Sequence, residues 1–152
     1  MGRNYRLKGD VELAQLTRSM RMRHDEAKAK ARIVPTGGSA VIVLPWPPTG
    51  NSAVRHTAAG GHYLRPEVKR YRAQVASICA GMPRIDTRYR LNVHFSPPDA
   101  RRRDMDNALK SLLDALVRAG WLPDDSMTYM RELHTTTDDA RNGCVIVSAT
   151  GV

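Results

Sequence analysis

This chain of 152 residues has few aromatic residues, two cysteines and no long apolar segment, and each shortage excludes a class of protein. Its single Phe argues against a surface that binds single strands by stacking many bases. Cys79 and Cys144 stand alone, whereas a zinc site needs four ligands at close spacing, so we expect reduced thiols in a cytoplasmic protein. No apolar run approaches the ~20 residues that span a membrane, and no apolar signal segment is recognisable, so no membrane association is expected.

The sequence also lacks the common signatures of nucleophilic and nucleotide-dependent enzymes. No Ser-His-Asp or Cys-His arrangement is apparent, and no glycine-rich phosphate loop is present, so no nucleotide cofactor is expected. What remains is a hydrophobic content of 41% and a net charge of +9, from 24 Lys and Arg against 15 Asp and Glu. This composition fits a globular domain with an anionic partner, and nucleic acid is the leading candidate.

Residues 1–38 differ from the rest of the chain and are predicted to form a basic N-terminal extension. They carry nine Lys and Arg against four Asp and Glu, and the stretch 10–32 combines a loose apolar stripe with high helix propensity. The sequence Pro35-Thr36-Gly37-Gly38 should end that helix. Two interpretations of this arm stay open, a solvated and partly ordered helix or an accessory segment that contacts DNA.

Residues 39–152 are predicted to form one α+β domain with a mixed β-sheet and two main helices. The expected order is β-α-β-α-β-β, because β-branched or alternating stretches predict strands and two segments have helical periodicity. The predicted strands cover 40–44, 88–95, 127–137 and 143–149, and the predicted helices cover 66–80 and 107–119. A basic, glycine-containing loop that includes Arg55 is expected after the first strand.

The segment 97–107 is the most informative part of the chain. It places Arg101, Arg102 and Arg103 directly before a pair of acids, Asp104 and Asp106. Three arginines attract a polyanion such as a nucleic-acid backbone, whereas two close carboxylates repel one. Two unit charges about 4 Å apart cost roughly 4 kcal/mol at an effective dielectric constant of about 20, and a hard divalent cation removes that cost. The segment therefore predicts a place where a phosphate backbone meets a Mg²⁺-type site.

Helix geometry limits how these two carboxylates can converge. Positions i and i+2 point to nearly opposite sides of a helix but to one side of an extended strand. We therefore expect the helix to begin at or just after Asp106, with Asp106 near its N-cap, where partial positive charge favours carboxylates and phosphates. Lys110 follows one turn later. It could stabilise charge on a scissile phosphate, or it could only form an i,i+4 helix pair with an acid such as Asp106 or Asp114.

A second acidic cluster, Asp124-Asp125, follows the second predicted helix. One interpretation is a simple turn. The other is a carboxylate that returns to the first acidic pair when the helix and the following strand pack together. The spacing does not decide which of the two residues would then be a ligand.

These residues resemble the RusA family of Holliday-junction resolvases, which are bacterial and prophage endodeoxyribonucleases. The resemblance covers about 40–149, and its central string is long and specific. The matching residues are Leu44-Pro45-Trp46-Pro47-Pro48, Asn51, Tyr63-Leu64, Tyr71-Arg72, Pro98, Arg103-Asp104-Met105-Asp106-Asn107, Lys110, Leu113-Asp114-Ala115-Leu116, Ala119-Gly120 and Asp124-Asp125. The sequence departs from the family at Ala100, where another basic residue is common, and residues 1–38 lie outside the resemblance.

The resemblance implies a homodimer that resolves four-way DNA junctions by Mg²⁺-dependent, paired symmetric cleavage in recombination and repair. It implies that Asp104, Asp106 and Asp125 bind the metal. It also implies that Lys110 is the essential lysine and that Arg103 adjoins the site. The predicted contacts to the DNA backbone are Arg55, Lys69, Arg70, Arg72, Arg101, Arg102 and Arg103. A prophage origin is a further expectation from the resemblance.

Two other functions stay open on the residues alone. A non-catalytic DNA-binding protein could use the acids as helix caps and turns, and its binding would weaken steeply with salt without any Mg²⁺-dependent product. A nucleotide-sugar transferase could use Asp104 and Asp106 as its metal pair, but that function gives no reason for the three arginines.

Overall fold

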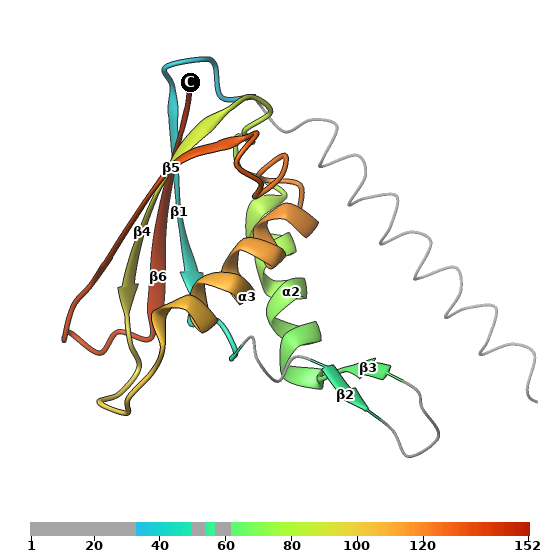
Figure 1. Ribbon diagram of the computed structural model, residues 1–152, viewed down its shortest axis with the longest axis vertical. Helices are drawn as coiled ribbons and strands as arrows, with labels where there is room; N and C mark the ends of the chain where they lie inside the picture. Colours follow the sequence, from blue (N-terminus) through green and yellow to red (C-terminus); the bar gives the residue numbers. More distant parts are fainter. Residues whose placement is uncertain (1–32, 50–53, 57–61) are drawn as a thin grey trace, which may run out of the picture.

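The structure, a computed structural model, describes residues 33–49, 54–56 and 62–152. The predicted helical arm within residues 1–32 and much of the basic loop after the first strand lie outside the described residues. The described part has four long strands in one sheet, two helices on one face of that sheet and a two-stranded hairpin beyond one helix (Figure 1). The predicted α+β class, with a mixed sheet and two main helices, is confirmed.

The sheet has the strand order β1-β6-β4-β5. β1 pairs antiparallel with β6, β6 pairs antiparallel with β4, and β4 pairs parallel with β5. The strands are β1 (Ser39–Pro45), β4 (Tyr89–Ser96), β5 (Met130–Thr137) and β6 (Cys144–Gly151). The parallel pair matters for the site, because the carboxyl ends of β4 and β5 lie at the same edge of the sheet.

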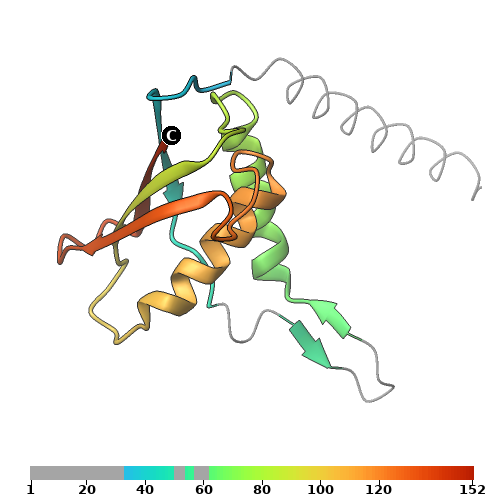
Figure 2. The same cartoon turned by 45° about the horizontal axis from the view of Figure 1, so that its top comes forward.

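Alternation along the strands places one face of the sheet against the helices. In β1, Ala40, Ile42 and Leu44 are buried, whereas Val41 and Val43 are exposed. The same alternation in β4 and β6 buries Tyr89, Leu91, Val93, Phe95, Val145, Val147 and Ala149. The helices α2 (Pro66–Cys79) and α3 (Met105–Arg118) cover this face, as the turned view in Figure 2 shows.

The helix α3 carries the predicted site at its first turn. Its buried side includes Leu112 and Leu116, neither of which has exposed surface. The helix ends at the predicted glycine, because Gly120 has a φ of 70° and its N–H donates to the Val117 carbonyl at 2.9 Å. The leucine stripe therefore anchors the helix, and it fixes the position of the first turn beside the sheet.

Two local elements differ from the sequence predictions. The predicted loop after β1 contains a short antiparallel hairpin of β2 (Val54–His56) and β3 (His62–Leu64), strands too short to give a periodic pattern. The strand β5 begins at Met130 instead of 127, because the N–H groups of Tyr129 and Met130 both donate to the Ser126 carbonyl and form a turn.

The core also includes residues just before the predicted domain start at 39. Val34 is only 3% exposed, and its N–H donates to the Arg84 carbonyl at 2.8 Å. Both cysteines are free thiols, and burial raises the pKa of the Cys79 thiol to about 12. Within the described ranges, neither helix is long and apolar enough to cross a membrane.

Asp138 ties the carboxyl ends of β4 and β5 together. His94 Nε2 lies 2.9 Å from Asp138 Oδ2, while Ser96 Oγ and the Ala140 N–H donate to Oδ1 at 2.8 and 3.0 Å. These hydrogen bonds, with that of His94 as the largest cause, lower the pKa of the Asp138 carboxyl from its ordinary value. The ionised carboxylate is therefore part of the folded structure at this edge of the sheet.

We predict that Asp138→Asn destabilises the domain at about pH 7 and much less at about pH 2.5. Because the folded-state pKa is depressed, the stabilisation is present above the ordinary pKa of 3.8 and is lost as the pH falls through the folded-state value. The Asp138 side chain is 33% exposed. Solvent therefore screens the carboxylate, and the loss of stability at neutral pH should be small compared with the loss of a buried ion pair. Urea denaturation at both pH values checks this, with Asp139→Asn as the neutral control; an equal loss at both pH values would contradict it.

Candidate functional site

The loop between β4 and α3 is organised around the Asp99 carboxylate. Arg101 binds it through its backbone N–H at 2.9 Å and through its guanidinium at 2.8 and 3.1 Å. Arg103 Nη1 lies 2.7 Å from Asp99 Oδ1, the oxygen that also accepts the Arg101 N–H. The hydrogen bond from Arg103, followed by those from Arg101, holds the pKa of Asp99 well below its usual range. Asp99 is therefore ionised at neutral pH, and its single negative charge is shared between two of the three adjacent arginines.

Arg103 is a structural residue of this loop as well as a neighbour of the acids. Its Nη1 also donates to the carbonyls of Asp99 and Arg101 at 3.2 and 3.1 Å. Its guanidinium lies 5.5 Å from the centroid of the Trp46 ring, which in turn meets Phe95 edge to face at 5.7 Å. These contacts join the loop to the segment after β1 and to the end of β4.

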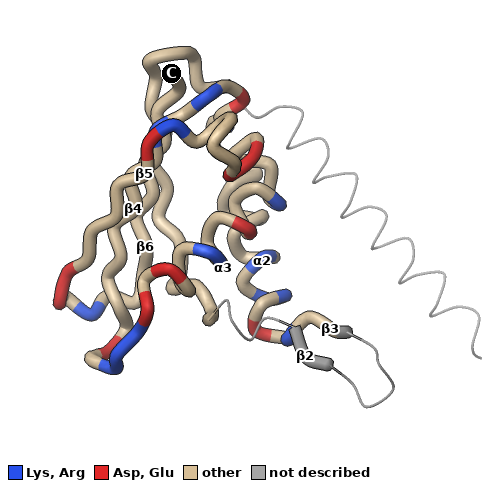
Figure 3. The backbone as a smooth tube through the Cα atoms, in the orientation of Figure 1, with Lys and Arg blue, Asp and Glu red and all other residues tan. Residues whose placement is uncertain are grey.

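Asp104 and Asp106 lie together at the start of α3. The helix begins at Met105, two residues before the predicted 107. The prediction of Asp106 near the N-cap is wrong, because Asp104 has an extended backbone with φ of −90° and ψ of 125° and occupies that position. Asp106 lies in the first turn, where its Oδ1 accepts the Asn107 N–H at 2.9 Å. Both carboxylates are exposed, and the positive end of the helix favours their ionised forms. Figure 3 shows the basic run of the loop followed directly by this acidic turn.

Lys110 lies one turn beyond Asp106 and is exposed. The alternative role in an i,i+4 helix pair is not supported, because Lys110 forms no ion pair with Asp106 or Asp114 within the described part of the chain. Asp114 instead binds Arg72 of α2 and lies 3.1 Å from Arg118 Nε. The ammonium group of Lys110 thus remains available beside the acidic pair.

Some of the other predicted DNA contacts form ion pairs with acids of the same chain, and the others form none within the described residues. Arg72 is committed to Asp114 and joins α2 to α3, while Arg101 and Arg103 are committed to Asp99. The remaining described ones are exposed: Lys69, Arg70 and Arg102. The side chain of Arg55 lies outside the described residues.

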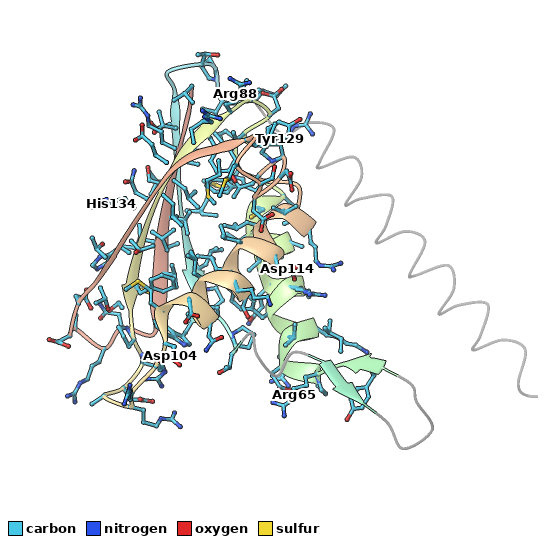
Figure 4. All side chains as sticks on the ribbon, in the orientation of Figure 1. Arg65, Arg88, Asp104, Asp114, Tyr129 and His134 are labelled. Atoms are coloured by element: carbon cyan, nitrogen blue, oxygen red, sulfur yellow. The ribbon has the colours of Figure 1, made fainter. Side chains whose placement is uncertain are left out.

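Asp125 lies far from the first acidic pair within one chain. The backbone carbonyl of its neighbour Asp124 accepts the hydroxyl of Tyr89 at 2.7 Å, and Tyr89 begins β4, whereas the loop to Asp104 leaves its far end. Figure 4 shows Asp104 and Tyr129, which follows Asp125 closely, at opposite ends of the sheet. No group of three His, Cys, Asp or Glu side chains within the described ranges is placed to hold a metal. The predicted return of Asp124 or Asp125 to the pair therefore does not occur within a single chain.

A cavity of about 190 Å³ adjoins Asp104. It is lined on one side by the segment after β1 and on the other by the loop and the first turn of α3. The lining residues are Trp46, Pro47, Pro48, Thr49, Arg102, Arg103, Asp104, Asn107 and Ala108. No pattern in the sequence predicts this cavity, because its two sides come from segments that are far apart in the chain.

We predict that Arg103→Ala exposes Trp46 to solvent, because the guanidinium lies over its ring. Acrylamide quenching of tryptophan fluorescence should increase, and the second tryptophan, Trp121, is only 1% exposed and should contribute little. Arg101→Ala is the matched control, since Arg101 also binds Asp99 but is not stacked on Trp46. Equal quenching in both variants would contradict this packing role.

Comparison with known proteins supports one family. The family model described as endodeoxyribonuclease RusA matches residues 45–147, which include the loop and the whole of α3. The crossover junction endodeoxyribonuclease RusA of Enterobacteria phage 82 is 39% identical over 90 residues, covering 56% of this chain and 72% of that protein. The protein of the same name from Escherichia coli K12 is 38% identical over 90 residues, with the same coverage. This chain therefore belongs to the RusA endodeoxyribonuclease family.

Proposed function

We propose that this chain is a Mg²⁺-dependent endonuclease that resolves four-way DNA junctions by paired, symmetric cleavage. The observation that carries the proposal is the arrangement at the start of α3. Two exposed carboxylates, Asp104 and Asp106, lie there with a run of arginines before them and Lys110 one turn behind. The relatives are named crossover junction endodeoxyribonucleases, an activity that is consistent with this chemistry.

Asp104 and Asp106 would hold the metal. Mg²⁺ prefers oxygen ligands and is commonly bound by one or two carboxylates together with water and substrate phosphates. This donor set fits, because both side chains are exposed and neither carboxylate is neutralised by an ion pair within the described residues. When bound, the ion would supply an activated water and offset negative charge at the phosphate.

The basic side chains would have two roles, to stabilise charge at the scissile phosphate and to contact the DNA backbone. Lys110 would stabilise the charge that develops on the scissile phosphate or the leaving oxygen. Arg102, beside the acids, and Lys69 and Arg70, on the exposed side of α2, would contact backbone phosphates and position the DNA without reading its sequence. The arginines that bind Asp99 and Asp114 would contribute less to this grip, because their charge is already paired.

A homodimer would explain how Asp125 takes part. A four-way junction has approximate two-fold symmetry, and two sites related by a two-fold axis would nick opposite strands. Within one chain Asp125 lies at the opposite end of β4 from the acidic pair, so it does not complete that site. In a two-fold dimer with opposed sheets, Asp125 of the partner subunit would reach the pair.

We predict that Asp106→Asn retains junction binding and loses cleavage by about 100-fold or more, because it removes one metal ligand and leaves the arginines unchanged. Gel-shift titration and cleavage of a labelled four-way junction measure the two properties separately. Asp86→Asn, an exposed acid in the loop before β4, is the matched control and should cleave normally. Retained cleavage by Asp106→Asn would exclude this metal site, and salt-sensitive binding without any Mg²⁺-dependent product of the wild type would favour the non-catalytic DNA-binding protein.

A mixed-dimer experiment tests the role of Asp125. Asp104→Asn and Asp125→Asn should each be inactive alone. When the two variants are co-expressed with different tags and purified as a mixed dimer, one of the two composite sites should regain both acids. We predict nicking of one strand of the junction without paired nicks on the opposite strand. No recovered nicking would show that Asp125 does not act across the dimer.

A further inference from the structure

The cavity beside Asp104 is a second, unassigned feature of the site. One wall is the ring of Trp46 with Pro47 and Pro48, and the facing wall is the start of α3. Asn107 and Thr49 supply the polar edge, and within the described ranges neither the Asn107 amide nor the Thr49 hydroxyl has a hydrogen-bond partner. The cavity therefore combines apolar side chains with two groups that both donate and accept, and with the charged side chains of Arg102, Arg103 and Asp104.

The walls of the cavity are fixed by contacts within the chain. The backbone N–H of Trp46 donates to the Gly143 carbonyl at 3.1 Å. The Trp46 ring meets Phe95 edge to face, and the guanidinium of Arg103 lies over one face of it. Gly143 itself has a φ of 64° and packs so closely on the loop that a Cβ there would lie 3.2 Å from Pro98 Cβ. A ligand entering this cavity would order little of the protein, which lowers the cost of binding.

The size and charge of the cavity limit what can occupy it. Its volume of about 190 Å³ is below the ~300 Å³ of the smallest drug-sized pockets. That suits a single planar heterocycle. A neutral base suits the cavity better than a phosphate, because the carboxylate of Asp104 borders it and offsets one of the two arginine charges that line it, those of Arg102 and Arg103.

We propose that this cavity takes one unstacked nucleobase of the nucleotide next to the scissile phosphate. The base would stack on the Trp46 and proline side, and the Asn107 amide would read its hydrogen-bonding edge. This inference rests on the proposed junction cleavage, since a phosphate at Asp104 and Asp106 places the attached base within reach of the cavity. Taking a base out of the stack costs less where pairing or stacking is already disturbed, as at the branch of a junction whose arms are unstacked. Trp46 and Asn107 are thus specificity-determining residues.

A binding experiment tests the proposal without cleavage. The full-length Asp106→Asn protein is titrated with four-way junctions that carry a fluorescent pyrimidine analogue at successive positions around the branch. One position should brighten on binding, and an abasic nucleotide at that position should weaken binding about tenfold. Asn107→Ala should reduce the affinity for the intact junction and have no further effect on the abasic one. Asn92→Ala, an exposed amide on the open face of β4, is the matched control and should bind like the parent.

The outcomes separate this inference from the proposed function. Trp46→Phe should keep the fluorescence change and Trp46→Ala should lose it, and Asn107→Ala still decides the matter if Trp46→Ala fails to fold. If the wild type makes paired nicks but no abasic position alters affinity or rate, the cavity does not bind a base, although the nuclease assignment stands. Equal loss of affinity by Asn107→Ala on intact and abasic junctions would also overturn the proposal. An absence of nicks with a position-specific fluorescence change would overturn the nuclease assignment and leave a base-binding protein.

Discussion

The ion pairs of Asp99 are the contacts on which the rest of the site depends. Three consecutive arginines lie in a short loop that must also lead two acids into the first turn of α3. Asp99 offsets the charge of Arg101 and Arg103 within that loop, and its lowered pKa keeps it ionised. Arg103 also lies over the ring of Trp46, which in turn packs against Phe95. The ion pairs of Asp99 thus help to fix the loop against the segment after β1 and against β4.

The same contacts change how the high positive charge of the chain should be understood. A net charge of +9 predicts an anionic partner, but it does not say which cations face that partner. Arg101 and Arg103 stabilise the loop, and Arg72 joins the two helices through Asp114. The cations near the site that form no ion pair within the described residues are fewer, and they include Arg102 and Lys110. Fewer cations are therefore proposed to contact DNA than the net charge alone suggests, and they are concentrated at the start of α3.

Much of the fold could be predicted from the sequence because its signals are local and periodic. The leucine stripe and Gly120 identify α3 and its end, and alternation identifies β1, β4 and β6. The helix start was placed two residues late, since a cap depends on the backbone angles of one residue, Asp104. The β2–β3 hairpin has only three residues in each strand, too few for a periodic signal.

The arrangement of the site was harder to predict for a different reason. Asp106 and Lys110 lie one turn apart on α3, and Asp104 is its N-cap, so the placement of all three near one end of the helix follows from local sequence. The place of Asp125 depends on how the loop after α3 turns, and the contact of Arg103 with Trp46 joins residues that are far apart in the sequence. Tertiary contacts of this kind leave no periodic pattern in a single sequence. The resemblance to the family supplied the residues of the site, whereas the structure supplied the roles of Asp99 and Trp46.

The central claim is metal-dependent cleavage that selects for a four-way junction. The most direct measurement incubates the wild-type protein with an end-labelled junction and a linear duplex of matched sequence, each with Mg²⁺ and with EDTA. The account predicts paired nicks at symmetric positions in the junction, none in the duplex and none in EDTA. Equal cleavage of the duplex, or nicks that persist in EDTA, would contradict it.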